Sequence, residues 1–190
     1  MRRLGALLIA LLVPVTLVLA LAGPAGADDP RWVFYTKDKR HYTSPWFKGA
    51  HRIMIPFGCT TAPYYSPDPR CQDDHGFHHG IDVAMPCGTP LRARFHARVV
   101  SNASLGPAYG DNPVLLRSHR LGWDLVIGHT QKVFVKRGDR VRKGQVFARA
   151  NDQAAPDGCH LHFEQRAVGG GLSTAVRPRD LLALTVKKKR

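Results

Sequence analysis

Acidic residues are scarce in this sequence, and glutamate is the scarcest of them. The 190 residues include 14 aspartates and glutamates against 28 lysines and arginines, a formal net charge of +14. Glu164 is the only glutamate. The helical His-Glu-x-x-His arrangement is therefore absent, which excludes a zinc protease of the type that uses this glutamate as general base. The base of any hydrolytic reaction must be another residue.

The sequence also lacks a nucleic-acid recognition motif and the Cys-x-x-Cys spacing of cysteine zinc sites. A basic chain can bind nucleic acid, but without such a motif, and with the export signal described next, we expect no nucleic-acid partner. The four cysteines do not have zinc-finger spacing, so thiolate zinc ligands are not expected.

The longest apolar run lies at the N-terminus. Arg2 and Arg3 precede an apolar stretch over residues 4–22, and Ala25 and Ala27 form the small-residue pair of a cleavage site. This order predicts a secretory signal peptide at residues 1–27 and a protein that is secreted or associated with the cell envelope. The run is also long enough for an uncleaved membrane anchor, the one case in which we expect a membrane partner. With no cysteine near this site, a lipid anchor is not expected.

Removing the signal peptide leaves 26 basic and 14 acidic residues, a net charge of 26 − 14 = +12. Outside a cell, such a surface attracts anionic cell-envelope polymers and carboxylate-bearing wall peptides. The alternative is that the charge serves only solubility. The basic tail at residues 185–190 adds to this charge.

Short apolar segments alternate with turn residues from Arg52 onwards. This spacing predicts an all-β, mostly antiparallel domain with a sandwich or barrel-like form over residues 53–184, preceded by an N-terminal extension at residues 28–52. About 163 residues without the signal peptide suit one domain, which we expect to be a monomer. The expected strands are 53–56, 81–84, 91–100, 114–118, 123–128, 141–149 and 160–166.

The N-terminal extension is rich in aromatic residues, and a short helical turn is expected at residues 178–182. The aromatic side chains either bury against the domain or form a surface on which carbohydrate stacks. They are Trp32, Phe34, Tyr35, Trp46 and Phe47.

Two histidine motifs predict a metal site. In a strand, His160 and His162 point to the same face about 6.6 Å apart. His78 and Asp82 would be about 13 Å apart in a fully extended strand, so the chain must bend between them, and Gly80 permits that bend. We therefore place His78 at a turn and Asp82 at the start of a strand. Two histidines and one aspartate form the donor set of a catalytic zinc, which predicts a metallohydrolase.

The metal motifs also carry a family resemblance. The runs HHGIDVAMPCGTPLRA (78–93), GHT (128–130), VKRGDRVRKGQVFA (135–148) and HLHFE (160–164) resemble, in this order, the lysostaphin-type zinc endopeptidases of bacterial peptidoglycan. The resemblance covers about residues 54–183. It implies the peptidase fold of that family and a Zn²⁺ cofactor.

The resemblance also implies roles for individual residues. His78, Asp82 and His162 would be the zinc ligands, with water in the fourth position, and His129 and His160 would be catalytic histidines that do not bind the metal. His78 is preferred over His79 because only His78 has the three-residue spacing before the aspartate. Zinc would lower the pKa of bound water while one histidine accepts its proton and the other stabilises the oxyanion.

Glu164 and two departures from the family pattern leave alternatives open. Glu164 either orients a histidine or lies on the strand surface. The loop 151–158 lacks the Ser-Thr-Gly type of sequence found in relatives, and residues 128–130 replace a Tyr-Ala-His-Leu type of run. Both differences bear on substrate binding, and neither removes a proposed ligand or catalytic histidine.

The four cysteines predict two disulfides, because an exported chain oxidises its thiols. Four cysteines allow three pairings. We expect Cys59 to pair with Cys71 across a proline-rich loop. Cys87 and Cys159 each lie beside a metal motif, and their pairing would tie the two motifs together.

These observations predict a secreted zinc endopeptidase that hydrolyses peptidoglycan stem peptides or cross-bridges. The alternative is a catalytically inactive family member that binds the cell wall or regulates another protein. The sequence does not distinguish a glycine-rich cross-bridge from a bond between D-alanine and a diamino acid.

Overall fold

The computed structural model describes residues 31–101 and 105–188. The predicted signal peptide at residues 1–27 and the last two residues of the basic tail lie outside these ranges. Within the described residues, no helix has the length and apolar character needed to cross a bilayer. Strands dominate this part of the chain, and each strand pair in it is antiparallel, as the alternating pattern predicts.

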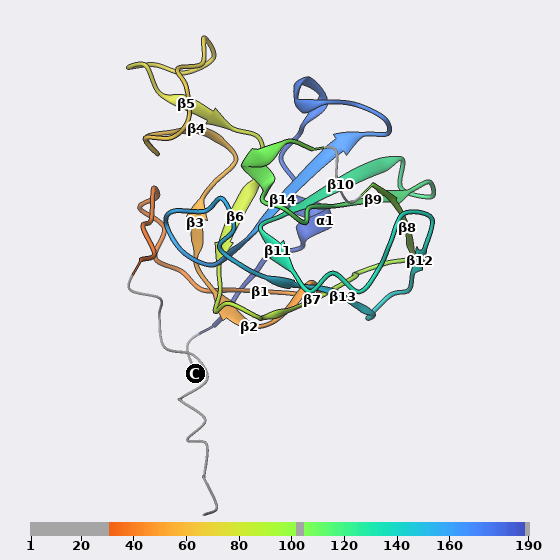
Figure 1. The fold of residues 1–190 in the computed structure, drawn as a ribbon. Helices are drawn as coiled ribbons and strands as arrows, with labels where there is room; N and C mark the ends of the chain where they lie inside the picture. Colours follow the sequence, from red (N-terminus) through yellow and green to blue (C-terminus); the bar gives the residue numbers. More distant parts are fainter. Residues whose placement is uncertain (1–30, 102–104, 189–190) are drawn as a thin grey trace, which may run out of the picture.

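A seven-stranded sheet forms the centre of the molecule (Figure 1). Its order is β12, β8, β9, β10, β14, β6 and β3. The eight-residue β14 lies between β10 and β6 and is buried along nearly its whole length. The bounds are β3 Ile53–Ile55, β6 Ile81–Ala84, β8 Ala97–Ser101, β9 Val114–Ser118, β10 Trp123–Gly128, β12 Arg140–Val141 and β14 His160–Ala167.

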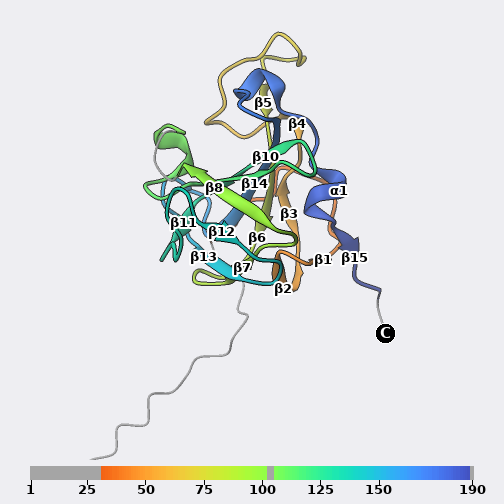
Figure 2. The ribbon, with the colours of Figure 1, turned by 90° about the vertical axis from the view of Figure 1, so that its right-hand side faces the viewer.

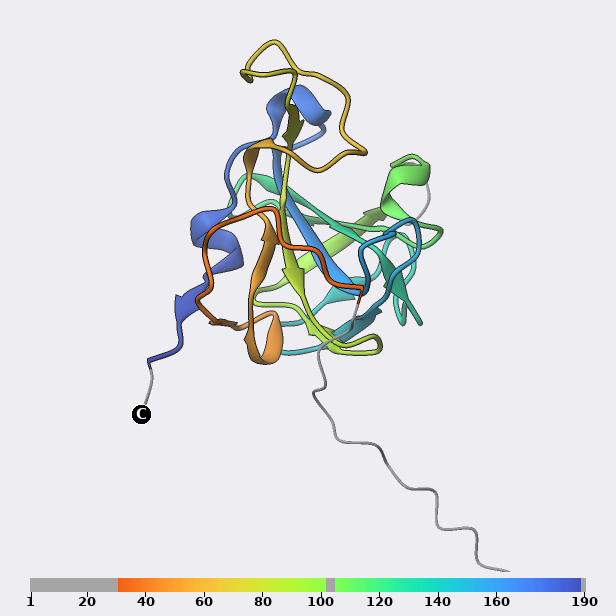
Figure 3. The same ribbon diagram turned by 90° about the vertical axis from the view of Figure 1, so that its left-hand side faces the viewer.

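Smaller sheets and short helical segments surround the central sheet. One three-stranded sheet contains β11 (Thr130–Gln131), β13 (Val146–Ala150) and β7 (Pro90–Arg92), and another contains β15 (Thr185–Val186), β1 (Tyr42–Ser44) and β2 (Phe47–His51). A two-stranded hairpin of β4 (Gly58–Thr60) and β5 (Gly76–His78) carries a loop that projects from the upper end of the molecule in Figures 2 and 3. The helical segments are η1 (Pro107–Tyr109), η2 (Leu172–Thr174) and α1 (Arg179–Leu182), the last within the expected helical turn.

The hydrophobic core lies on one face of the central sheet. Leu161 and Phe163 of β14 point into it, so the alternating His160, His162 and Glu164 face the other way. Trp46 fills the centre of the core, with its ring centroid 4.9 Å from that of Phe163. The opposite, outer face of the sheet is therefore left for polar chemistry.

Residues of the N-terminal segment belong to this core. Trp46 and Phe47 are 1 % and 4 % exposed, so these two aromatic residues are buried rather than available for carbohydrate stacking. The Trp46 indole N–H donates to the carbonyl of Leu181 at 2.8 Å. At the other end of the chain, β15 lies in the expected basic tail and pairs with β1.

Two of the expected strands are each divided between two sheets. The 91–100 segment becomes β7 and β8, and the 141–149 segment becomes β12 and β13. A tight turn closed by the Gln145 N–H to Arg142 carbonyl bond separates β12 from β13, and Gly144 adopts φ +81° in it. The alternation of apolar and polar residues continues through such a turn and does not reveal it. The prediction of single strands was therefore wrong for these two segments.

Candidate metal centre

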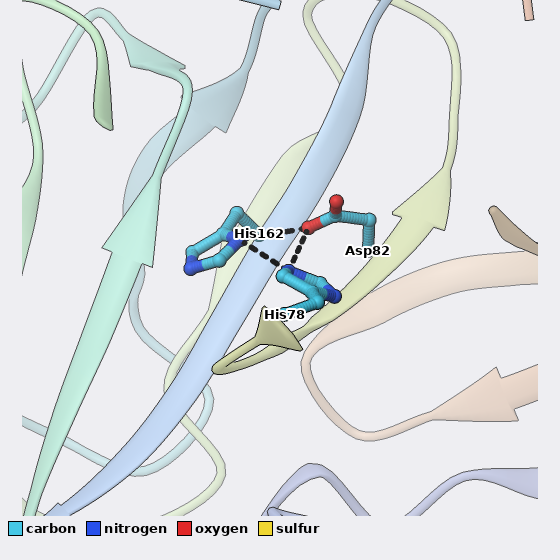
Figure 4. A group of neighbouring side chains, drawn as sticks. All are labelled: His78, Asp82 and His162. Carbon is cyan, nitrogen blue, oxygen red and sulfur yellow. Dashed lines mark hydrogen bonds and ion pairs between the residues drawn. The ribbon is translucent and has the colours of Figure 1, made fainter. Parts of the chain in front are cut away.

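The antiparallel register of three strands brings the two histidine motifs together. On β14, His162 lies directly opposite Asp82 of β6 on one side and Gly128 of β10 on the other. His78 is the last residue of β5, and the chain bends before β6 begins at Ile81. Figure 4 shows the three side chains converging from β5, β6 and β14. The predicted bend between His78 and Asp82 is present.

The atoms that face one another in this cluster have the spacing of metal ligands. His162 Nδ1 is 2.8 Å from Asp82 Oδ1, His78 Nε2 is 3.2 Å from His162 Nδ1, and His78 Nε2 is 3.4 Å from Asp82 Oδ1. Ligand bonds of about 2.0–2.2 Å around a tetrahedral zinc place neighbouring donors about 3.3 Å apart. Two of the three separations match this value, and the donor set fits a small divalent cation.

Hydrogen bonds on the far side of each imidazole orient the rings. His78 Nδ1 donates to the carbonyl of Pro56 at 3.1 Å, and His162 Nε2 donates to Glu164 Oε1 at 2.9 Å. With these bonds made, His78 Nε2 and His162 Nδ1 both face Asp82, and each would offer its lone pair to a cation that displaces the proton. A backbone carbonyl or a carboxylate behind the imidazole is the usual support of a metal-binding histidine. Of the two alternatives for Glu164, the structure therefore shows the one in which it orients a histidine.

Burial and charge act in opposite directions on Asp82. Desolvation raises the pKa of this carboxyl, but the neighbouring His78, His160 and His162 outweigh it and hold the pKa well below its usual range. At the other end of the pair, burial lowers the pKa of His162, but Asp82 and Glu164 raise it to about 10. A buried carboxylate held anionic between imidazoles is the charge arrangement that a divalent cation needs.

The two remaining motif histidines lie beside this cluster. His160 Nδ1 donates to the carbonyl of Gly158 at 3.0 Å, and His129 Nδ1 donates to the carbonyl of Gln153 at 2.6 Å. Their ring centroids are 4.4 Å apart. His160 Nε2 is 3.7 Å from Asp82 Oδ1 and is a buried polar atom that has no hydrogen-bond partner in the described structure. Such an atom is explained by a ligand or water that it would contact.

His129 has the environment of a neutral histidine. Burial lowers its pKa, and the charges of His160 and His162 lower it further, to about 3. With Nδ1 protonated and bonded to Gln153, the free lone pair is at Nε2. The backbone of His129 is left-handed, at φ +50°, where β10 ends. His129 and His160 can therefore each accept a proton at Nε2.

Comparison with known proteins identifies the family. The model of peptidase family M23 matches residues 76–177, which include both metal motifs and the histidine between them. The chain belongs to peptidase family M23. The sequence motifs resemble the lysostaphin-type members of this family. The family assignment that this resemblance implied is therefore confirmed.

Named relatives and solved structures agree with this assignment. The chain is 31% identical over 110 residues to the glycyl-glycine endopeptidase ALE-1 of Staphylococcus capitis, covering 56% of this chain and 29% of the relative. It is 35% identical over 118 residues to the DD-carboxypeptidase/endopeptidase Mpg of Neisseria meningitidis, covering 62% and 25%. The catalytic domain of lysostaphin from Staphylococcus simulans superposes with a TM-score of 0.57 at 26% identity, covering 70% of this chain and 92% of that domain. The chain thus spans less than a third of these two curated relatives.

The cluster of His78, Asp82 and His162, called the M23 centre from here on, borders a cleft of about 500 Å³. It is lined by residues of the loop between β4 and β5, of the η1 and η2 segments, and by His78, His129 and His162. His79 also lines the cleft but stays outside the cluster, with its Nε2 3.0 Å from Arg70 Nη2. An extended peptide that enters the cleft would therefore reach the histidines.

Behind the M23 centre lies a buried network that the sequence did not reveal. The Tyr109 hydroxyl donates to Glu164 Oε1 at 2.8 Å, and Arg166 donates to Glu164 Oε2 at 2.6 Å and to the Tyr109 hydroxyl at 2.6 Å. This network holds the carboxylate that orients His162. Because side chains alternate faces along β14, Arg166 could have been predicted to lie on the same face as Glu164. No local pattern predicts the position of Tyr109, which comes from η1.

Both predicted disulfides are present. Cys59 pairs with Cys71, and Cys87 pairs with Cys159. The second pair joins the chain after β6 to the residue before β14, so it connects the two metal motifs covalently. A group of Cys87, Asp152 and Cys159 has the proximity of metal ligands, but the disulfide consumes both thiolates. This arrangement excludes a thiolate metal site at these residues.

Proposed function

We propose that the protein is an exported zinc endopeptidase that hydrolyses peptide bonds in bacterial cell-wall peptidoglycan. The observation that carries this proposal is the buried cluster of His78, Asp82 and His162, whose two histidines line an open cleft. The printed names of the M23 relatives, glycyl-glycine endopeptidase and DD-carboxypeptidase/endopeptidase, support the substrate class. Two disulfides support an oxidising environment outside the cytoplasm.

In this proposal the three clustered residues hold the zinc, and the residues around them handle protons. When bound, zinc lowers the pKa of water and polarises a carbonyl. His160 lies on the same strand face as the ligand His162, so its Nε2 is placed to accept a proton from water. His129 comes from the end of β10 and would stabilise the developing oxyanion. Glu164 keeps the His162 ring oriented and does not itself transfer a proton.

The proposal of export rests on the N-terminal sequence together with the disulfides. Residues 1–27 have the order of a secretory signal peptide. Peptidoglycan lies outside the cytoplasmic membrane, so export is required to reach it. N-terminal sequencing of protein recovered from the culture medium or the wall fraction tests this part, with Asp28 as the expected first residue.

Digestion of purified cell wall, followed by mass spectrometry of the released peptides, tests the activity and identifies the bond. We expect released peptides with new termini, loss of release with a chelator and recovery on addition of Zn²⁺. The His162→Ala variant is the matched control for contaminating hydrolases. Retained zinc without any released peptide would contradict the proposal and indicate a wall-binding protein instead.

A further inference from the structure

Three arginines lie directly opposite one another on neighbouring strands of the central sheet. Arg140 of β12 is paired with Arg98 of β8, and Arg98 is paired with Arg117 of β9. Cross-strand partners share a face, and adjacent strands are about 4.8 Å apart, so the three side chains form a row. Like charges directly opposite one another destabilise a sheet. The pairing of Arg98 with its arginine neighbours therefore does not stabilise the sheet.

The row is the centre of a basic groove. A second basic or titratable residue lies two positions from each arginine, just beyond the end of its strand: His96 beside Arg98, His119 beside Arg117 and Arg142 beside Arg140. These six residues line a groove of about 680 Å³. All except Arg117 are exposed, so the groove is accessible to a large ligand.

Little negative charge balances this groove. Arg117 is bound by both oxygens of Asp124 at 2.7 Å. Within residues 31–101 and 105–188, the Arg98 side chain donates to the carbonyl of Gly138 alone, at 3.1 Å. Among the described residues, no ion pair involves Arg98, Arg140 or Arg142. About three arginine charges therefore remain available to an anionic ligand.

The groove and the M23 centre lie on the same outer face of the sheet. Asp124, the partner of Arg117, is four residues along β10 from Gly128, which lies opposite His162. Four residues of strand correspond to about 13 Å. The residues that line the groove and the residues that line the catalytic cleft are different sets. Figure 1 shows β12, β8 and β9 in the same continuous sheet as β14, with β10 between β9 and β14. One polymer surface can therefore meet both regions at once.

We propose that this groove binds a linear phosphodiester polymer that carries no aromatic bases. All long cationic side chains in it are arginines, whose planar guanidinium matches two phosphate oxygens at once. Among the described residues that line the groove there is no Phe, Tyr or Trp, whereas single-stranded nucleic acid is held by aromatic stacking. The apolar lining residues are Ala97 and Val141 alone, which is too little for membrane insertion. The groove would dock the enzyme on an anionic envelope polymer, independently of hydrolysis.

Binding of labelled poly(glycerol phosphate) to the full chain, followed by fluorescence anisotropy across a salt series, tests this proposal. Three arginine contacts predict a slope of log K against log salt of about −2, since each phosphate contact on a flexible strand contributes about −0.7. The double variant Arg98→Gln/Arg140→Gln should lower the steepness of this slope by about 1.4 and the affinity by about 60-fold at 0.05 M salt. Arg98→Lys/Arg140→Lys should keep the slope but bind more weakly, because lysine lacks the two-point contact.

The control variant is Lys37→Gln/Lys39→Gln, which removes the same charge from two exposed residues of the segment before β1. In Figure 1 this orange segment lies on the other side of the molecule from β12. We expect it to bind almost as the native chain does. If the two glutamine variants lost affinity for the polymer equally, the proposal would be overturned in favour of general charge attraction. Tighter, arginine-dependent binding of single-stranded DNA or of phosphatidylglycerol vesicles would overturn it in favour of that ligand.

Polymer binding by the groove can be measured separately from the proposed hydrolysis. Binding should persist with the metal removed by a chelator, and both glutamine variants should hydrolyse small soluble wall peptides at the native rate. Loss of that hydrolysis in Arg98→Gln/Arg140→Gln alone would show that the groove acts through the catalytic centre, contrary to the proposal.

Discussion

Replacing Gly80 with alanine tests whether the close approach of the β5–β6 connection to β14 builds the metal centre. A Cβ atom at this position would lie 2.8 Å from Phe163 O, 2.8 Å from His162 Cε1 and 3.0 Å from Glu164 Cγ. Gly80 does not have a positive φ, so its role is to leave space rather than to adopt a left-handed conformation. The nearest obstacle includes backbone, which cannot rotate away as a side chain can.

The size of the effect follows from these contacts. Relieving a 2.8 Å contact requires β14 and the β5–β6 connection to separate by roughly half an ångström, and overpacking of this kind costs about 1–3 kcal/mol. For a chain of this size, a loss of about 2 kcal/mol lowers the melting temperature by roughly 6 °C. The same displacement moves His162 and its support Glu164, so zinc affinity should fall by about 10–100-fold.

Denaturant unfolding and competition with a chromophoric zinc chelator measure the two effects. Gly171→Ala is the matched control, because a Cβ there meets no atom within 4 Å and the backbone has an ordinary φ of −89°. The control should change stability by less than about 0.5 kcal/mol. If Gly80→Ala matched this control in both stability and zinc affinity, the close approach would have no part in building the centre.

Three further substitutions test the proposed roles. Asp82→Ala should abolish stoichiometric zinc, because two histidines are too few donors for a stable site, and elemental analysis of the purified variant decides this. His129→Ala should keep zinc and folding but lower the rate of wall hydrolysis at least about 100-fold, so a near-native rate would remove it from the mechanism. Replacing Cys87 and Cys159 together with alanine should destabilise the chain by about 4 kcal/mol in the chain-entropy model for a loop of 72 residues, and unchanged denaturant midpoints would contradict that.

Local chemistry made much of the fold and of the centre predictable. The period of two in a strand placed His160 and His162 on one face, and the spacing of His78 and Asp82 required the bend that the structure contains. The Cys87–Cys159 disulfide was predicted from the positions of these cysteines beside the motifs, and the Cys59–Cys71 disulfide from the proline-rich loop that it closes. Each of these inferences depends on residues that are close in sequence or on a covalent pairing with few alternatives.

Tertiary structure decided the features that depend on partners distant in sequence. Residues 91–100 could continue as one strand or turn into a second sheet, depending on which strands pair with their backbone. The alternation of apolar and polar side chains along the segment is the same in both cases. The reason for Gly80 appears only when β14 lies against it. Tyr109 reaches Glu164 across 55 residues, and the row of Arg98, Arg117 and Arg140 exists only through strand register. The sequence by itself determined which histidines share a strand face and where the chain must bend between His78 and Asp82, because these features follow from local periodicity. The register of non-local strands decided which side chains surround them.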